Sequence, residues 1–172
     1  LMMTAVTVGF GRYQMRVMKK DFGIDLPAYE SFPNTPQIMM RYTRAIHETL
    51  NAQVQKDPDV LVTEEAIQKL DEELNRRFSY AIVREGDTII YESPQMDQPD
   101  IVKYLPDFGD ADDDVDGCTY LGGDIQSMIK QVDVTTSDGT EYSFFLITSA
   151  QKAIPQLHSL AIDIILMVFL IL

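Results

Sequence analysis

The residues best suited to chemistry in this sequence are the aspartates of GDADDDVDG, which covers residues 109–117. Asp112, Asp114 and Asp116 alternate along the chain and a glycine follows them. An EF-hand calcium loop begins in the same way, with ligands at positions 1, 3 and 5 and glycine at position 6. Its position 12 is a bidentate glutamate, but here that position is Gly123. Because the closing ligand is missing, the pattern argues against a true EF-hand.

Two interpretations of this acidic stretch remain open. The first is a looser divalent site, in which Asp112, Asp114 and Asp116, together with Asp110, bind Ca²⁺ or Mg²⁺ through their carboxylates. The second is a charged surface loop without a metal, because the six aspartates between Asp107 and Asp116 repel one another. The sequence predicts no other cofactor.

Other residue types that perform catalysis are few and scattered. The two histidines, His47 and His158, are far apart in the sequence, which favours neither a catalytic triad nor a histidine-rich metal site. The single cysteine, Cys118, excludes an internal disulfide. A net charge of -13 argues against a nucleic-acid partner, since binding to phosphates needs basic residues.

Both ends of the sequence are apolar. LMMTAVTVGFG opens it, and LAIDIILMVFLIL closes it with Asp163 as the one charge. Each run is shorter than the roughly 20 residues of a membrane-spanning helix. We expect residues 1–11 to end one such helix, residues 160–172 to begin a second, and residues 12–159 to form the domain between them. The alternative is a hydrophobic terminal helix packed in the core. Four basic residues follow the first run and are expected to meet lipid phosphates: Arg12, Arg16, Lys19 and Lys20.

The elements that must position these residues begin with two helices. The first is predicted to open at Thr35 as the N-cap, with Pro36 in the first helical position, and to end at Asp57–Pro58. Its apolar stripe is Met39, Tyr42, Ile46, Leu50 and Val54. The second helix is predicted to start at Thr63. Its buried side is Ala66, Ile67, Leu70, Leu74 and Phe78.

Two β-hairpins follow, separated by a segment rich in loops. FSYAIVREGDTIIYES is predicted to turn at Gly86-Asp87, and IKQVDVTTSDGTEYSFFLITSA at Asp138-Gly139. Between them, residues 94–124 are expected to hold a short helix near residues 100–105 and a short strand near residues 118–121. The chain therefore reads as helices, hairpin, variable segment, hairpin and apolar exit.

Two-residue turns fix a register for each hairpin and predict which side chains share a face. In the first hairpin, Ile82 would face Tyr91, and one face would carry Tyr80, Ile82, Arg84, Ile89 and Tyr91. In the second, the core face would carry Val132, Val134, Phe145 and Ile147. The opposite face would carry Gln131, Asp133, Thr135, Tyr142, Phe144 and Leu146.

A covered face that mixes tyrosines with charged groups could hold a small molecule. The candidate ligand-binding residues are Tyr80, Arg84, Tyr91, Asp133 and Tyr142. The alternative is that the tyrosines seal the sheet beneath a helix while Arg84 and Asp133 reach solvent at its rim. A slip of one residue in either register would exchange the two faces.

This order of elements resembles the extracytoplasmic sensor domains of bacterial transmembrane receptors, which have the PAS-like fold of the PDC and Cache groups. The residues that carry the resemblance are FSYAIVREGDTIIYES, IKQVDVTTSDGTEYSFFLITS and the apolar run that follows them. It covers essentially the whole chain, through a shared layout more than through fixed residues. It implies an α/β (α+β) fold with a central antiparallel sheet of about five strands, a long N-terminal helix and flanking helices.

The resemblance is closest to sensor histidine kinases of two-component systems, and it implies a function in signal transduction. A small-molecule ligand or a partner protein would contact the sheet and its loops, and the membrane helices would pass the signal to a cytoplasmic kinase outside this chain. The domain would face the extracytoplasmic side of the cell membrane, anchored at both termini, as a homodimer joined through its N-terminal helices. In some related domains, acidic patches bridge to lipid phosphates through divalent cations.

The parent protein would then be a histidine protein kinase, but no enzymatic activity is expected of this chain. It contains neither a phosphoacceptor histidine segment nor a glycine-rich nucleotide lid. Two alternatives remain open. One is the ectodomain of a chemoreceptor or of a cyclic-dinucleotide enzyme. The other is a membrane-anchored binding module without kinase output.

Overall fold

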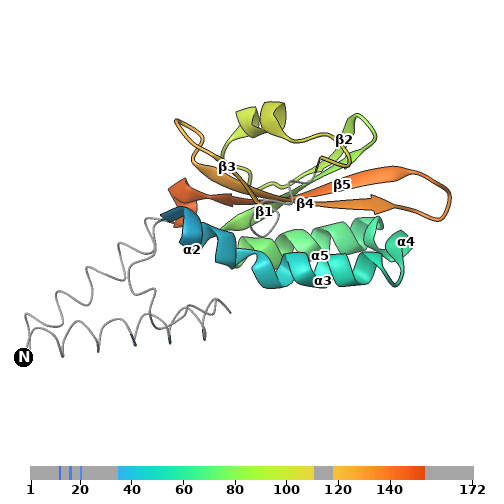
Figure 1. Ribbon diagram of the computed structural model, residues 1–172, viewed down its shortest axis with the longest axis horizontal. Coiled ribbons are helices and arrows are strands. Elements are labelled where there is room, and N and C mark those ends of the chain that lie inside the picture. The colour runs from blue at the N-terminus through green and yellow to red at the C-terminus, as the bar shows by residue number, and fades with distance from the viewer. Residues whose placement is uncertain (1–11, 13–15, 17–19, 21–34, 111–117, 154–172) are drawn as a thin grey trace, which may run out of the picture.

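The computed structural model describes residues 12, 16, 20, 35–110 and 118–153. The described part is an α+β structure with one open antiparallel sheet of five strands in the order β2-β1-β5-β4-β3 (Figure 1). The strands are β1 Ser79–Glu85, β2 Thr88–Glu92, β3 Cys118–Leu121, β4 Ser127–Thr135 and β5 Glu141–Ser149. The helices are α2 Thr35–Tyr42, α3 Arg44–Val54, α4 Pro58–Leu61, α5 Glu64–Asn75 and the 3-10 helix η1 Pro99–Tyr104. The predicted α+β class and five-stranded antiparallel sheet are thus confirmed.

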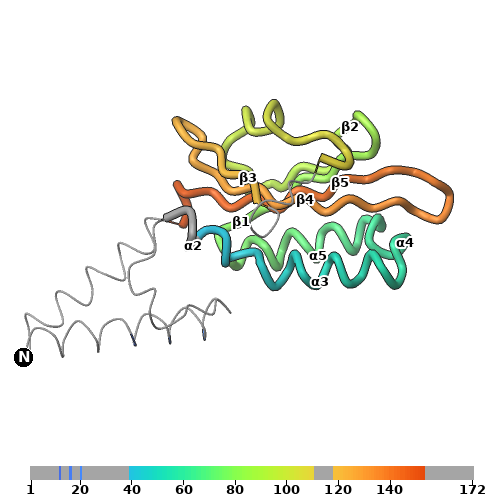
Figure 2. Tube along the Cα trace, viewed as in Figure 1, coloured from blue at the N-terminus to red at the C-terminus, as the bar shows by residue number. Residues whose placement is uncertain are grey.

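The sheet lies between a layer of helices and a layer of loops. Figure 1 shows α3 and α5 beneath the sheet and η1 above it. In Figure 2, the blue to green part of the tube that contains α3, α4 and α5 forms the helix layer. The chain after α5 forms the sheet and the loop layer. The expected membrane-helix ends, residues 1–11 and 160–172, lie outside the described residues, as does the start of the expected long N-terminal helix.

Each face of the sheet has its own hydrophobic core. The helix face packs against α3, α4 and α5 through Ala81, Val83, Val132, Val134, Phe144 and Leu146. The loop face packs against Ile101 of η1 through Tyr80, Ile82, Ile129, Phe145 and Ile147. Because β1, β4 and β5 are covered on both sides, their sequences are apolar at successive positions, as expected for strands in the middle of a sheet.

The predicted first helix is divided in two. Its stripe residues Met39, Tyr42, Ile46 and Leu50 are all buried, as the spacing of three and four predicts. Thr43, however, has φ -107° and ψ 1°, outside the helical range, so α2 ends at Tyr42 and α3 begins at Arg44. After α3 ends, Pro58 begins the short helix α4. The first N–H of a helix has no partner within the helix, so a proline there costs no hydrogen bond.

The second helix starts where the sequence predicts. Thr63 is its N-cap, and the Thr63 side chain accepts a hydrogen bond from the backbone N–H of Ala66 at 3.3 Å. Ile67, Leu70 and Leu74 are buried as expected. Phe78 was expected on the same stripe, but α5 ends at Asn75 and Phe78 lies beyond it.

The first hairpin has the predicted turn but not the predicted faces. Gly86 has φ 52°, which a two-residue turn with glycine first requires, and Arg84 faces Ile89. A bulge then places Val83, not Ile82, opposite Tyr91. The extra residue in β2 moves Tyr91 to the helix face, so the prediction that it shares a face with Tyr80 was wrong.

The second hairpin differs by one residue from the predicted register. Its loop holds three residues, because Thr136 N–H donates to Thr140 O at 3.0 Å and Gly139 N–H donates to Thr136 O at 2.9 Å. Gly139 takes φ 86°, the left-handed conformation that closes a three-residue loop. Val132 therefore pairs with Phe144 instead of Phe145, and the predicted faces of β5 are exchanged.

The predicted elements of the variable segment are present. η1 spans Pro99–Tyr104 and β3 spans Cys118–Leu121. β3 pairs with β4 along one edge of the sheet, with Cys118 opposite Lys130. The connection between η1 and β3 is described as far as residue 110, at the loop face of the sheet.

Candidate functional site

The five predicted ligand residues divide between the two faces of the sheet. Tyr91 and Tyr142 pack against the core of the helix face. Tyr80 belongs to the loop face, and Arg84 and Asp133 share that face because each pairs with Ser143 of β5. The exchange follows from the bulge in β2 and from the three-residue loop after β4. A single pocket lined by all five residues is therefore not formed.

Arg84 binds the segment of chain that follows η1. Its Nη2 donates a hydrogen bond to the backbone oxygen of Pro106 at 2.7 Å, and its guanidinium lies 5.2 Å from the centre of the Phe145 ring. Arg84 Nε is buried and has no acceptor among the described residues. The guanidinium is thus held against the sheet by one carbonyl and one aromatic ring, without a carboxylate partner among the described residues.

Asp133 binds the same segment from β4, on the other side of β5. Its carboxylate accepts from the backbone N–H of Gly109 at 2.8 Å, from Ser143 Oγ at 2.8 Å and from Gln131 Nε2 at 2.8 Å. Gln131 Nε2 also donates to the backbone oxygen of Asp107 at 2.9 Å. Three side chains of the sheet, Arg84, Gln131 and Asp133, therefore hold residues 106–110 across the loop face.

This polar cluster is the candidate site. Part of the predicted binding face is occupied by the chain itself, since residues 106–110 receive the contacts that a ligand would make. Gln131 Oε1 and Arg84 Nε are left without partners among the described residues. Buried polar atoms usually have partners, so an acceptor and a donor remain for a bound molecule or water.

Tyr80 lies at the other end of β1, four residues from Arg84, or about 13 Å along an extended strand. Its side chain is fully buried, and the ammonium of Lys152 lies 5.7 Å from the ring centre. Burial and the nearby carboxylate of Asp97 raise the pKa of Tyr80 above its ordinary value. Tyr80 is therefore a core residue beside the end of β5 and is separate from the cluster at residues 106–110.

Sequence reasoning missed Asp71, a buried carboxylate on α5 that is 3% exposed. It accepts from the backbone N–H of Ala81 at 2.8 Å, from Ser93 Oγ at 2.7 Å, from Tyr91 Oη at 3.0 Å and from Asn75 Nδ2 at 3.0 Å. The sequence does contain an indication of this burial, because Asp71 lies four residues after Ile67 and therefore on the apolar stripe of the helix. Its role is structural, since it joins α5 to β1 and to the end of β2.

The predicted metal ligands Asp112, Asp114 and Asp116 lie outside the described residues. Within the part that is described, no group of three or more histidine, cysteine, aspartate or glutamate side chains could hold a metal ion. None of the helices among these residues has the length and hydropathy needed to cross a bilayer.

Comparison with known proteins gives no further constraint. No family model matches the chain, and neither a curated protein nor a solved structure matches it.

Proposed function

We propose that the chain is the extracytoplasmic, PAS-like sensor domain of a bacterial transmembrane sensor histidine kinase. The observation that carries this proposal is the pairing of β1 with β5. It joins two hairpins that are far apart in the sequence into one sheet, with helices on one face and the variable segment on the other. A central antiparallel sheet is what the resemblance to PDC and Cache sensor domains implies.

The polar cluster of the loop face supports a sensing role. Arg84, Gln131 and Asp133 hold residues 106–110 by hydrogen bonds to their backbone, and these contacts do not depend on the side chains of that segment. A ligand or a partner protein with a carboxylate and a hydrogen-bond donor would compete for the same groups. Binding would then favour an arrangement in which residues 106–110 are displaced, and the two arrangements would have different affinities for the ligand.

The signal would leave through β5. This strand lies in the centre of the sheet and pairs with both β1 and β4, and Ala150 follows it directly. A change at Asp133 and Ser143 would therefore reach the exit segment through a single strand. In the proposed receptor, the exit segment leads to the second membrane helix, and two copies associate through their N-terminal helices.

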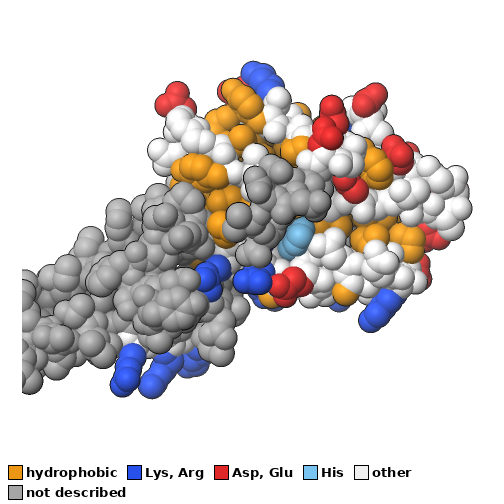
Figure 3. Space-filling model, viewed as in Figure 1, with side chains coloured by type: hydrophobic (Ala, Val, Ile, Leu, Met, Phe, Trp, Pro, Cys, Tyr) orange, Lys and Arg blue, Asp and Glu red, His pale blue; other side chains and the backbone are white. Residues whose placement is uncertain are grey.

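The described surface carries many acidic side chains. Figure 3 shows acidic side chains spread over the described part of the drawn face, between patches of hydrophobic side chains.

We propose that the acidic stretch, with Asp112, Asp114 and Asp116, binds a divalent cation weakly. Thermal melts of the chain in Ca²⁺, in Mg²⁺ and in chelator test this, with a variant carrying all three Asp→Asn changes as the control. Equal melting temperatures in all three solutions would contradict metal binding.

The coding sequence beyond Leu172 tests the kinase output directly. We expect a HAMP-like pair of helices followed by a phosphoacceptor histidine segment. A stop codon after Leu172 would contradict the proposal, and a different output domain would favour the chemoreceptor or cyclic-dinucleotide alternative.

A functional test uses the full-length parent protein in membrane vesicles, with autophosphorylation as the readout. Asp133→Asn weakens the hold on residues 106–110 and is expected to change the basal rate of phosphate incorporation. Asp87→Asn, at the exposed tip of the first hairpin, removes the same charge and is the matched control. Equal rates for the wild type and both variants would contradict a sensing role for the loop face.

A further inference from the structure

A cavity of about 640 Å³ lies at the end of the sheet where β1 begins and β5 ends. Its described lining comes from the last turn of α5, from the start of β1, from the connection after β2 and from the helical residues 150–153 after β5. The lining residues are Glu72, Asn75, Arg76, Phe78, Ser79, Gln95, Gln151 and Lys152. The volume is in the range of sites that hold small molecules. None of the residues predicted from the sequence to bind a ligand lines it.

Two cations in the lining have no carboxylate partner among the described residues. The ammonium of Lys152 donates to the backbone oxygen of Gln95 and lies over the Tyr80 ring, 5.7 Å from its centre. The guanidinium of Arg76 makes no ion pair with any described carboxylate, although the neighbouring Arg77 is paired with Glu73. The chain has 27 acidic and 14 basic residues. Two such cations on one cavity therefore give it a charge opposite to that of the chain as a whole.

The rest of the lining supplies groups that recognise amides. The side chains of Asn75, Gln95 and Gln151 each carry both a donor and an acceptor. Glu72 lines the same cavity, and its negative charge disfavours ligands with two or more negative charges. The lining residues together therefore fit a ligand that has one carboxylate and several neutral polar groups.

The backbone at this cavity is in an unusual conformation. Phe78 has φ 56°, a left-handed value that bulky side chains rarely adopt. Its ring is held against Tyr42, with 5.9 Å between the ring centres. This turn brings the end of α5 against the start of β1 and so forms one wall of the cavity. Backbone outliers of this kind cluster at ligand-binding positions.

We propose that this cavity binds a small amide-containing carboxylate, of which a short peptide C-terminus is the simplest example. Arg76 would bind the carboxylate with two parallel hydrogen bonds, Lys152 would add a second positive charge, and the amide side chains would contact the ligand backbone. The bound molecule would join α5 to the helical residues 150–153 after β5. Binding requires only this chain, so the inference would remain valid if no kinase followed.

The test uses a matched pair of probes with the 172-residue chain in mild detergent. Acetyl-dialanine has a free carboxylate, and acetyl-dialanine amide differs only in lacking the charge. Titrations followed by NMR are expected to shift the backbone amides of Asn75–Ser79 and of residues 150–153. The carboxylate should bind at least about tenfold more tightly than the amide, since hydrogen bonds between charged groups are the strong ones.

Variants separate the cavity from general electrostatics. Arg76→Ala is expected to weaken binding of acetyl-dialanine about tenfold or more, and Lys152→Gln removes the second charge while keeping a donor for the Gln95 carbonyl. Lys69→Ala removes one charge from an exposed position of the same helix, outside the lining, and should change the affinity less than about twofold.

Four outcomes would overturn the proposal. They are the absence of amide shifts with both probes, equal affinity for the charged and the amidated peptide, tighter binding of inorganic phosphate than of acetyl-dialanine, and equal losses in Arg76→Ala and Lys69→Ala. An unchanged NMR spectrum of each free variant away from the substituted residue verifies that the fold is intact.

Discussion

Two buried charged side chains of this domain have opposite surroundings. Asp71 accepts four hydrogen bonds within the helix face. Lys130 is fully buried on β4, between Met128 and Val132 along the strand, and its ammonium has no hydrogen-bond acceptor among the described residues. The first arrangement stabilises the fold, whereas an unpaired buried ammonium destabilises it.

Asp71→Ala is expected to lower the free energy of unfolding by about 3 kcal/mol, because it leaves several buried donors without an acceptor. Asp71→Asn keeps one oxygen and should lower it less. Urea unfolding monitored by circular dichroism measures both. Glu72→Ala, on the exposed side of the same turn, is the control and should have little effect. Equal stability of Asp71→Ala and Glu72→Ala would mean that the hydrogen-bond network is not stabilising.

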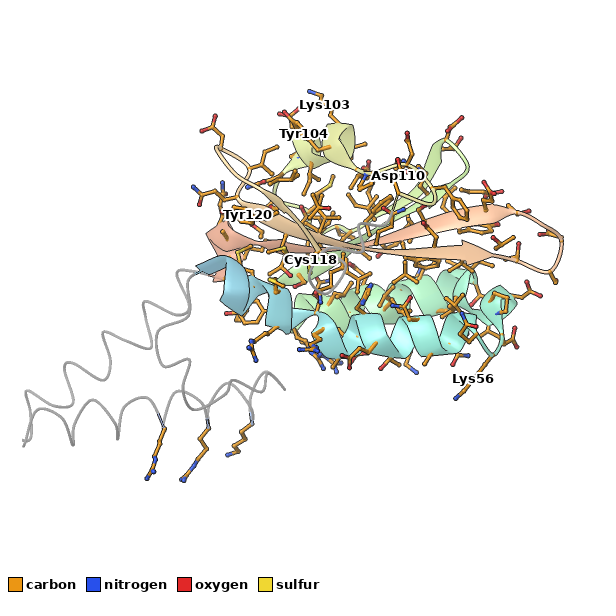
Figure 4. All side chains as sticks on the ribbon, viewed as in Figure 1. Lys56, Lys103, Tyr104, Asp110, Cys118 and Tyr120 are labelled. Carbon is orange, nitrogen blue, oxygen red and sulfur yellow. The ribbon has the colours of Figure 1, made fainter. Side chains whose placement is uncertain are left out.

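Lys130→Met is expected to raise the free energy of unfolding by about 1–3 kcal/mol, because methionine fills similar space without a charge to bury. Lys56→Met serves as the control, since Figure 4 shows Lys56 pointing away from the molecule. The same urea titration compares them. A loss of stability in Lys130→Met would show that the ammonium has an acceptor outside the described residues.

At the scale of elements, the two turns decide which faces the hairpins present. Both contain a glycine at positive φ, Gly86 at 52° and Gly139 at 86°. The first loop has two residues, whereas the second has three, with the glycine last. The length of the second loop sets the register of β4 against β5, and that register places Asp133 rather than Val132 on the loop face.

Gly139→Ala tests the second turn. Nothing lies within 4 Å of the added methyl group, so the effect comes from the backbone conformation alone. We expect the free energy of unfolding to fall by about 1 kcal/mol. Gly122→Ala is the matched control, because Gly122 does not have a positive φ and its new methyl group would only touch Tyr120 at 3.8 Å. Thermal unfolding of the two variants should therefore differ, and equal melting temperatures would contradict the role given to Gly139.

At the scale of the whole molecule, tyrosines on both faces link stability to alkaline pH. Burial, followed by the charge of Asp71, raises the pKa of Tyr91 from 10.0 to about 12. Burial also raises the pKa of Tyr42 and of Tyr80. A raised pKa in the folded state means that the folded chain holds the proton more tightly than the unfolded chain. This contribution to stability is therefore complete below the unfolded value of 10.0 and is lost as the pH rises toward 12.

The free energy of unfolding is thus expected to be independent of pH near pH 9 and to fall between about pH 10 and 12. Urea titrations at each pH, with tyrosine ionisation followed by absorbance, measure the loss. Tyr91→Phe should show a smaller loss over the same range, although its stability at pH 8 is lower because the hydrogen bond to Asp71 is gone. Tyr104 is an exposed residue, with 53% of its surface accessible, so Tyr104→Phe should follow the wild type. Parallel curves for all three proteins would contradict the linkage.

The sequence by itself determined most of the described helices, strands and turns. The spacing of Ile67, Leu70 and Leu74, the cap at Thr63 and the turn at Gly86 are local patterns, and local patterns specify helices, strands and turns. The same local patterns predicted two hairpins and one short strand, whereas the single antiparallel sheet and the α+β class were implied by the resemblance to sensor domains.

Only the tertiary structure decided which side chains meet. One extra residue in β2 and one in the loop after β4 moved Tyr91 and Tyr142 to the helix face, and neither shows in a local pattern, because side chains alternate with a period of two. Two partners of Asp133, Gly109 and Ser143, lie outside its own strand, so these contacts come from the packing of separate segments. The cavity beside Arg76 likewise exists only because the end of α5, the start of β1 and the helical residues after β5 converge in space.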